Sequence, residues 1–336
     1  MTGVPAEGPE SREDRIIRQY FGPLARHPGA FGLGDDAAIL TPPPDHDVVL
    51  KADAIIGGVH FFARDPADAV ARKALRVNLS DLAAKGAKPA GFLLSLALPA
   101  ECDEGWIAAF AQGLKIDSDD FGCPLLGGDT DRTPGPAMIS IAAFGLVPRG
   151  TMVLRSGAKV GDVVLVTGTI GDAALGVRLR AEPGELTRWR LVARAGAHLE
   201  RRYLLPEPRN GIAAALRAHA SAAMDVSDGL VGDLAKLCRA SRVAADVDIA
   251  RVPLSDAARQ AVSAVPELIE HVLTGGDDYE VICTMSPERT ASFHRAAEQA
   301  GLEVTEIGSI RAGEGACFRD ENDRPVSFAR PSYSHF

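Results

Sequence analysis

Apolar residues recur along this chain at two spacings, one typical of helices and one typical of buried strands. Leu230, Leu234 and Leu237 follow a helical spacing, whereas Phe92–Leu98 is a short and mostly apolar run that predicts a buried strand. The same criteria predict helices at 11–20, 65–85, 104–117, 172–180 and 228–241, and strands at 47–52, 92–98, 137–147 and 162–167. Helices and strands mixed in this way predict an α/β protein.

The chain is long enough for two domains. Its 336 residues exceed the roughly 250–300 residues at which a single hydrophobic core stops growing. A break between the two series of predicted elements falls at Pro148–Arg155. We therefore expect a disordered segment at 1–10, an N-terminal domain at 11–150 and a C-terminal domain at 151–336.

Short motifs recur in the same order in the two halves. Asn78–Asp81 resembles Asp225–Asp228, and Gly127–Asp129 resembles Gly275–Asp277. If these matches reflect an internal repeat, the two halves have similar α/β structures.

Composition excludes several classes of protein. The net charge of −9 argues against a surface that binds nucleic acid. The longest apolar run, about 90–100, is shorter than the ~20 residues of a membrane-spanning helix, and residues 1–15 show no signal peptide. Five cysteines without a Cys-x-x-Cys pair indicate reduced thiols. The sequence therefore predicts a cytoplasmic protein with no nucleic-acid or membrane partner.

Acidic residues gather in six clusters, most of them beside glycine. Glycine lets the backbone approach a ligand closely, and carboxylates bind hard cations. Because magnesium prefers a few carboxylates together with substrate phosphates, the pattern predicts an enzyme that binds a magnesium nucleotide. The clusters are Gly34–Asp36, Asp53, Asn78–Asp81, Gly128–Asp131, Asp225–Gly229 and Gly276–Glu280.

Each motif also has a simpler structural interpretation. Gly-Asp pairs are common in tight turns, and one Asp of Asp225–Asp228 would suffice to cap a helix. His60, between apolar residues, resembles a structural histidine. Ser227 lacks the Gly-x-Ser-x-Gly context of a nucleophile. Gly168–Gly171 precedes a predicted helix and could bind a phosphate at its N-terminus, although it is not a Walker A loop.

Taken together, the motifs resemble those of the thiamine-monophosphate kinase family, within the wider aminoimidazole-ribonucleotide-synthetase-like superfamily. Gly-Val-His-Phe, Asn-Leu-Ser-Asp-Leu-Ala-Ala and the C-terminal Tyr-Ser-His-Phe are the more specific motifs, and the resemblance spans nearly the whole chain. The motifs occupy 34–38, 58–61, 73–84, 127–130, 155–162, 166–172, 225–230, 275–280 and 333–336.

The resemblance implies a two-domain architecture of mixed sheets flanked by helices, with an active site between the domains and a homodimer formed through the N-terminal domains. It implies ATP as co-substrate, several Mg²⁺ ions and thiamine monophosphate as acceptor. The positions that match metal ligands are Asp36, Asp53, Asp81, Asp129, Asp225 and Asp228. Nucleotide contacts match Gly128, Asp129, Arg155 and Ser227, and substrate contacts match His60, Asp277 and Tyr333.

The chain departs from the family pattern at two places. Lys51 and Ala52 stand where hydroxyl residues usually precede Asp53, and Asp277 stands where the family has Glu. We expect Lys51 to supply charge that a metal ion would otherwise bring, and Asp277 to contact the substrate over a longer distance or through water.

The expected chemistry is direct in-line phosphoryl transfer. The acceptor phosphate is already anionic near neutral pH, so a strong general base is not required. Two alternatives stay open at this point. One is a superfamily member that uses ATP to activate a carbonyl or amide oxygen, and the other is a non-catalytic sensor of metal or nucleotide.

Overall fold

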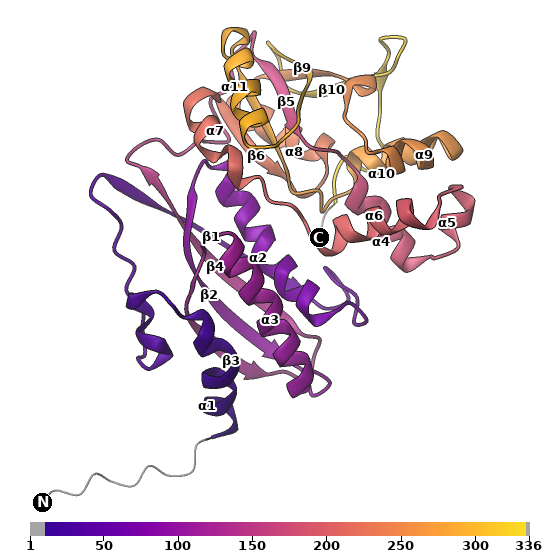
Figure 1. The fold of residues 1–336 in the computed structure, drawn as a ribbon. Coiled ribbons are helices and arrows are strands. Elements are labelled where there is room, and N and C mark those ends of the chain that lie inside the picture. Colours follow the sequence, from indigo (N-terminus) through magenta and orange to yellow (C-terminus); the bar gives the residue numbers. More distant parts are fainter. Residues whose placement is uncertain (1–10, 334–336) are drawn as a thin grey trace, which may run out of the picture. The chain divides into compact units, whose positions relative to one another are not determined.

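The structure is a computed structural model that describes residues 11–333. The segment 1–10, expected to be disordered, and the last three residues lie outside the described part. The described chain forms two compact units, and each consists of segments that alternate along the sequence with those of the other (Figure 1). The first unit runs to Pro44 and includes Leu50–Leu75 and Pro89–Phe144, and the second consists of Asp45–Val49, Arg76–Lys88 and Gly145 onward.

A sheet with strand order β1-β4-β2-β3 organises the N-terminal part of the described chain. Strands β2 and β3 run parallel, and α3 provides the crossover that a parallel pair requires. In β4, alternate residues such as Ile139 and Ile141 are buried, as expected for a sheet covered on one face. The elements are β1 (His46–Ile56), α2 (Ala67–Ala84), β2 (Lys88–Leu98), α3 (Glu104–Asp120), β3 (Leu125–Arg132) and β4 (Met138–Pro148).

Short helices precede this sheet. Ser11 caps the first of them, since its hydroxyl oxygen accepts a hydrogen bond from the Asp14 N–H at 3.0 Å, as its capping position predicts. The helix changes to a wider π-helical turn within the predicted range of 11–20. The elements are α1 (Arg12–Ile16), η1 (Ile17–Phe21), η2 (Gly22–Leu24) and η3 (Pro28–Leu33).

Helix α2 is buried along most of its length. Leu75, Leu79 and Leu82 follow helical spacing and are fully inaccessible to solvent. Burial of one such side chain contributes about 1.5–3 kcal/mol. The first half of α2 belongs to the first unit and the second half, from Arg76, to the second unit.

The second unit contains a sheet with strand order β11-β10-β7-β9-β5-β8-β6 within the described residues. Apolar side chains are buried on both of its faces, and every residue of β8 is buried. Its strands are β5 (Val163–Thr167), β6 (Ala222–Val226), β7 (Ala244–Asp248), β8 (Glu280–Met285), β9 (Val304–Arg311), β10 (Gly315–Arg319) and β11 (Pro325–Val326).

Helices cover both faces of this sheet. One apolar cluster includes residues of α4, α6, α8, α9 and α10, and another includes residues of α7 and α11. The helical elements are α4 (Asp172–Ala181), α5 (Glu185–Arg188), α6 (Ala193–Leu204), η4 (Asn210–Ile212), α7 (Ala213–His219), α8 (Leu230–Ser241), η5 (Ile249–Arg251), α9 (Asp256–Ala264), α10 (Leu268–Thr274) and α11 (Pro287–Gln299).

The two halves are not structural copies of each other. Their sheets differ in strand order, and the matched motifs lie on different elements. Asp81 lies inside α2, whereas Asp228 lies between β6 and α8. Gly127–Asp129 lies in β3, whereas Gly275–Asp277 forms a turn before β8. The short matches therefore do not mark an internal structural repeat.

Candidate active site

The predicted site residues fall into two groups, one in each compact unit. The first unit carries Asp36, Asp53, His60, Gly128 and Asp129. The second carries Asp81, Arg155, Asp225, Ser227, Asp228, Asp277 and Tyr333. Each group is described within its own unit.

Three predicted motifs meet around Ser80 in the second unit. The Ser80 hydroxyl on α2 is fully buried and donates a hydrogen bond to Oδ2 of Asp225 at 3.1 Å. The same hydroxyl lies 3.4 Å from the backbone oxygen of Tyr279. Asp225 lies in β6 opposite Val281 of β8 and is 5% exposed. The motifs Asn78–Asp81, Asp225–Asp228 and Gly275–Glu280 are therefore neighbours, as a convergent site requires.

The turn between β6 and α8 is held by two residues that sequence reasoning missed. One carboxylate oxygen of Asp233 accepts hydrogen bonds from the backbone N–H groups of Ser227 and Asp228, both at 2.9 Å. The ammonium group of Lys236 lies 2.5 Å from Asp228 and 2.7 Å from Asp233. Burial raises the pKa of Asp233, although its bonds to Lys236 oppose that shift. The only available signal was their spacing of three residues on a predicted helix.

The C-terminal substrate motif also reaches this turn. The Tyr333 N–H donates to the backbone oxygen of Asp228 at 3.0 Å, and the Tyr333 side chain is half exposed. Arg155 lies in an exposed segment before β5. Lys85, the residue after α2, donates to the Ala223 carbonyl at 2.8 Å.

The turn Gly275–Tyr279 has a strained backbone. Asp277 and Tyr279 have φ angles of 72° and 52°, a region that costs a non-glycine residue on the order of 1–3 kcal/mol. Two hydrogen bonds hold it in place, from Asp277 N–H to Ser227 O at 2.9 Å and from Tyr279 N–H to Val226 O at 2.8 Å. A Cβ at Gly276 would lie 2.3 Å from Ser227 O. The two site turns are thus packed backbone against backbone.

The N-terminus of α4, where Gly168–Gly171 could bind a phosphate, contacts a carboxylate of the protein itself. The Gly171 N–H donates to both carboxylate oxygens of Asp278 at 2.9 Å. Burial raises the pKa of Asp278 well above its usual range, although its bond with Gly171 opposes that shift. The N-terminus of α4 therefore anchors the Gly275–Tyr279 turn.

In the first unit, the ammonium group of Lys51 pairs with Asp53 at 3.0 Å. Asp36 lies in an exposed bend after η3. His60 is half buried, and its Nδ1 accepts a hydrogen bond from the Ile56 N–H at 3.0 Å. A neutral ring that accepts at Nδ1 carries its proton on Nε2, which is the arrangement that can donate to an anion.

Gly128 lies in a strand and not in a turn. It pairs with Leu94 of β2, and a Cβ at Gly128 would lie 1.9 Å from the Leu94 carbonyl oxygen. The glycine therefore has a packing reason that is independent of any ligand. Asp129, the next residue, is exposed and its Oδ1 accepts from the Thr130 N–H at 3.0 Å.

The carboxylates of both groups are chemically suited to magnesium, which prefers oxygen ligands. Asp53 and Asp228 already bind a lysine ammonium group, so both are oriented to accept a cation. Among residues 11–333, no three His, Cys, Asp or Glu side chains lie close enough together to hold a metal ion by themselves. In the same part of the chain, no helix is long and apolar enough to cross a membrane.

Comparison with known proteins identifies both halves. Residues 34–147 match the AIR synthase related protein N-terminal domain, and residues 159–319 match the corresponding C-terminal domain. Thiamine-monophosphate kinase from Caulobacter vibrioides is 44% identical over 316 residues, which cover 93% of this chain and 87% of that protein.

Solved structures give the same result. The crystal structure of thiamine-monophosphate kinase from Stenotrophomonas maltophilia superposes with a TM-score of 0.81 at 40% identity, covering 91% of this chain and 94% of that chain. AaThiL complexed with AMPPCP and TMP superposes with a TM-score of 0.76 at 30% identity, covering 92% and 97%. Both domain models match, and the identity to a thiamine-monophosphate kinase extends over nearly the whole chain. The chain therefore belongs to the thiamine-monophosphate kinase family.

Proposed function

We propose that this protein transfers the γ-phosphoryl group of ATP to thiamine monophosphate and so forms thiamine diphosphate and ADP. The meeting of Ser80, Asp225 and Tyr279 carries the proposal structurally, because it brings three family motifs together in one unit. The relative solved with AMPPCP and TMP supports this pair of substrates.

The reaction forms one P–O bond and breaks another. An oxygen of the acceptor phosphate attacks the γ-phosphorus, while the bond from the γ-phosphorus to the bridging oxygen breaks and its electron pair leaves with ADP. The attacking oxygen is anionic near neutral pH, so no side chain has to remove a proton. Alignment and charge neutralisation are the remaining requirements.

The carboxylates of both units would hold magnesium, which when bound screens the repulsion between ATP and the acceptor phosphate. Asp225 suits this role because Ser80 and the β6–β8 ladder fix it. Asp228 suits it because Asp233 and Lys236 hold its backbone and side chain. The six proposed ligands are Asp36, Asp53, Asp81, Asp129, Asp225 and Asp228.

Separate residues would bind the two substrates. Arg155 and Ser227, together with Gly128 and Asp129, are the proposed nucleotide contacts. The proposed contacts to thiamine monophosphate are His60, Asp277 and Tyr333. His60 supports this assignment because Nδ1 accepts from Ile56, which leaves the proton of a neutral ring on Nε2. Tyr333 supports it because its backbone N–H bonds to Asp228 and its side chain is half exposed.

We also propose a homodimer in the cytoplasm. Figure 1 shows α2 and α3 along one face of the β1-β4-β2-β3 sheet. On β1 and β4, Leu50 is 70% exposed and Met138 is 38% exposed, and contact with a second copy of the chain would bury such apolar side chains. The five cysteines are free thiols, and four are buried, which supports a reducing compartment.

The decisive experiment incubates the purified protein with ATP, Mg²⁺ and thiamine monophosphate and detects thiamine diphosphate by mass spectrometry. Parallel reactions lack metal or contain free thiamine in place of the monophosphate. We expect product only in the complete reaction. Bound ATP without product would favour a superfamily member that activates a carbonyl or amide oxygen. A trapped phosphorylated enzyme would contradict direct transfer.

A further inference from the structure

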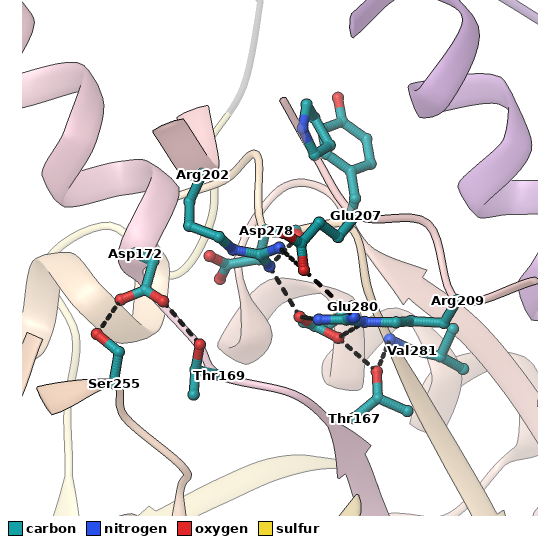
Figure 2. Close-up of polar contacts among 12 residues, drawn as sticks. Thr167, Thr169, Asp172, Arg202, Glu207, Arg209, Ser255, Asp278, Glu280 and Val281 are labelled. Atoms are coloured by element: carbon teal, nitrogen blue, oxygen red, sulfur yellow. Dashed lines mark hydrogen bonds and ion pairs between the residues drawn. The ribbon is translucent and has the colours of Figure 1, made fainter. Parts of the chain in front are cut away.

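A group of buried charges surrounds Glu280 at the start of β8 (Figure 2). Glu280 is fully buried, and its carboxylate pairs with Arg202 at 2.8 Å. It also binds two nitrogens of Arg209, namely Nε at 2.6 Å and Nη2. Arg202 and Arg209 are only 4% and 12% exposed. Glu207 completes the group, with its Oε2 at 3.1 Å from Arg202 and 3.6 Å from Arg209. We call these four residues the Glu280 cluster.

The cluster is balanced in charge, with two guanidinium groups and two carboxylates. Burial opposes ionisation of Glu207, but Arg202, Arg209 and Arg201 outweigh it and lower its pKa. Thr167 adds a hydrogen bond to Glu280 at 2.6 Å and accepts one from the Val281 N–H at 2.8 Å. Removing charges from water is costly, so a buried ion group is weak support for stability alone. Stability alone therefore does not explain the cluster, and the residues that it holds in position are a better explanation.

The cluster lies directly beside the strained turn. Glu280 follows Tyr279, whose φ is 52°, and Asp277 two residues earlier has a φ of 72°. Arg202 lies 3.4 Å from the backbone oxygen of Asp278, inside the turn. A shift of Glu280 would therefore move the backbone that sets the direction of the Asp277 side chain.

The segment that carries Arg209 is itself tied to α2. The Arg76 guanidinium donates to Pro206 O at 2.8 Å, and the Asn210 amide donates to Leu79 O at 3.3 Å. Ser80, next to Leu79, contacts Tyr279 O. The contacts thus close a ring that runs from α2 through the 206–210 segment and Glu280 to the turn and back to α2.

We infer that Arg209 and Arg202 are positioning residues, which hold Glu280 so that the Gly275–Tyr279 turn keeps Asp277 in the conformation that contacts thiamine monophosphate. The inference rests on the proposed function for the identity of the substrate. The part that concerns the turn rests only on the contacts within the second unit.

The test replaces Arg209, because Glu280 then keeps Arg202 and Thr167 as partners. Arg209→Met removes the guanidinium group and its charge. Arg209→Lys keeps the positive charge but loses the bidentate contact with Glu280. Arg188→Met is the control outside the cluster, since Arg188, 55% exposed, also pairs with a mostly buried carboxylate, Glu185, at 3.0 Å. If Arg209→Met does not fold, Arg209→Lys and Thr167→Val are compared with the parent protein instead, because each weakens one contact to Glu280.

Two readouts separate positioning from general stability. In steady-state kinetics, we expect Arg209→Met to raise the KM for thiamine monophosphate about tenfold, the size of one lost charged hydrogen bond, with the KM for ATP within about twofold. Arg209→Lys should restore part of the difference. In hydrogen exchange, the amides of Asp277 and Tyr279 should exchange about tenfold faster, while those of β5 stay unchanged.

The outcomes are distinct. Equal effects on both KM values, or faster exchange throughout the second unit, would make the cluster a general structural element and overturn the inference. Unchanged kinetics and exchange would overturn it as well. If the parent protein forms no thiamine diphosphate, the proposed function fails, and the exchange comparison still decides whether Arg209 holds the turn.

Discussion

The ammonium group of Lys51 lies 3.0 Å from a carboxylate oxygen of Asp53. The two residues are two positions apart on β1, so their side chains leave the same face of the strand. Both are partly exposed, at 29% and 38%, and such a pair contributes at most ~1 kcal/mol to stability. The pair therefore matters chiefly because it brings a fixed positive charge to a proposed metal ligand.

Lys51→Thr should make the reaction depend more steeply on free Mg²⁺, because a metal ion must then supply the charge of the ammonium group. Titration of the rate against free Mg²⁺ measures this. Lys115→Thr is the control, since Lys115 pairs with Asp119 on the exposed surface of α3 at 2.7 Å. An unchanged magnesium dependence in Lys51→Thr would show that the ammonium group does not replace a metal charge.

Asp81→Asn and Asp228→Asn should lower turnover on the order of a hundredfold or more, since each removes charge from the proposed metal site at constant volume. Their unfolding midpoints should change far less. Turnover and thermal unfolding are measured on the same preparations, with Asp256→Asn as control because that side chain is 99% exposed. Normal turnover with normal stability would remove these residues from the site.

Gly128→Ala should lower the free energy of unfolding by about 1–3 kcal/mol, because the added Cβ meets the Leu94 carbonyl of the neighbouring strand. Urea unfolding measures the loss. Gly135→Ala is the control, because a Cβ at Gly135 would lie 3.5 Å from the Thr133 hydroxyl oxygen, which is an ordinary van der Waals distance. Equal stability of the two variants would argue that Gly128 is retained for a ligand and not for packing.

The His198–Asp172 pair predicts a pH-dependent stability. Nε2 of His198 lies 3.1 Å from Asp172, and this hydrogen bond raises the pKa of His198 above 6.5. A raised folded pKa gives stability that is complete below pH 6.5 and is lost as the pH rises through the folded value. We expect a decrease of less than about 1 kcal/mol, because His198 is partly exposed.

Urea unfolding at several values between pH 6 and 8 checks this prediction. His198→Gln should remove the decrease, and His294→Gln, on α11, should keep it. A decrease of the same size in His198→Gln would assign the effect to other groups.

Local pattern was sufficient for much of the fold. The apolar spacing of Leu230, Leu234 and Leu237 predicted α8, and the helix predicted at 11–20 includes α1, because both depend on neighbours within a few residues. Family motifs supplied the rest of the architecture.

Long-range contacts account for what the sequence could not predict. The pairing of Arg209 with Glu280 joins residues 71 positions apart and leaves no periodic signal. Gly127–Asp129 suggested a turn, yet pairing with β2 extends it as a strand. Positive φ angles at Asp277 and Tyr279 depend on the neighbouring Val226–Ser227 backbone, which local propensity does not contain.

The division of α2 between the two units limits how this protein can be cut or recombined. Ala84, near the end of α2, is fully buried in the same apolar cluster as Leu165, Ile212 and Val281 of the second unit. A fragment that starts at residue 151 would lack this part of its own core, together with Ser80 and its bond to Asp225. Exchange of halves between relatives at that point would pack the α2 of one relative into the core of the other, so a chimera should join the halves before Arg76 and not at residue 151.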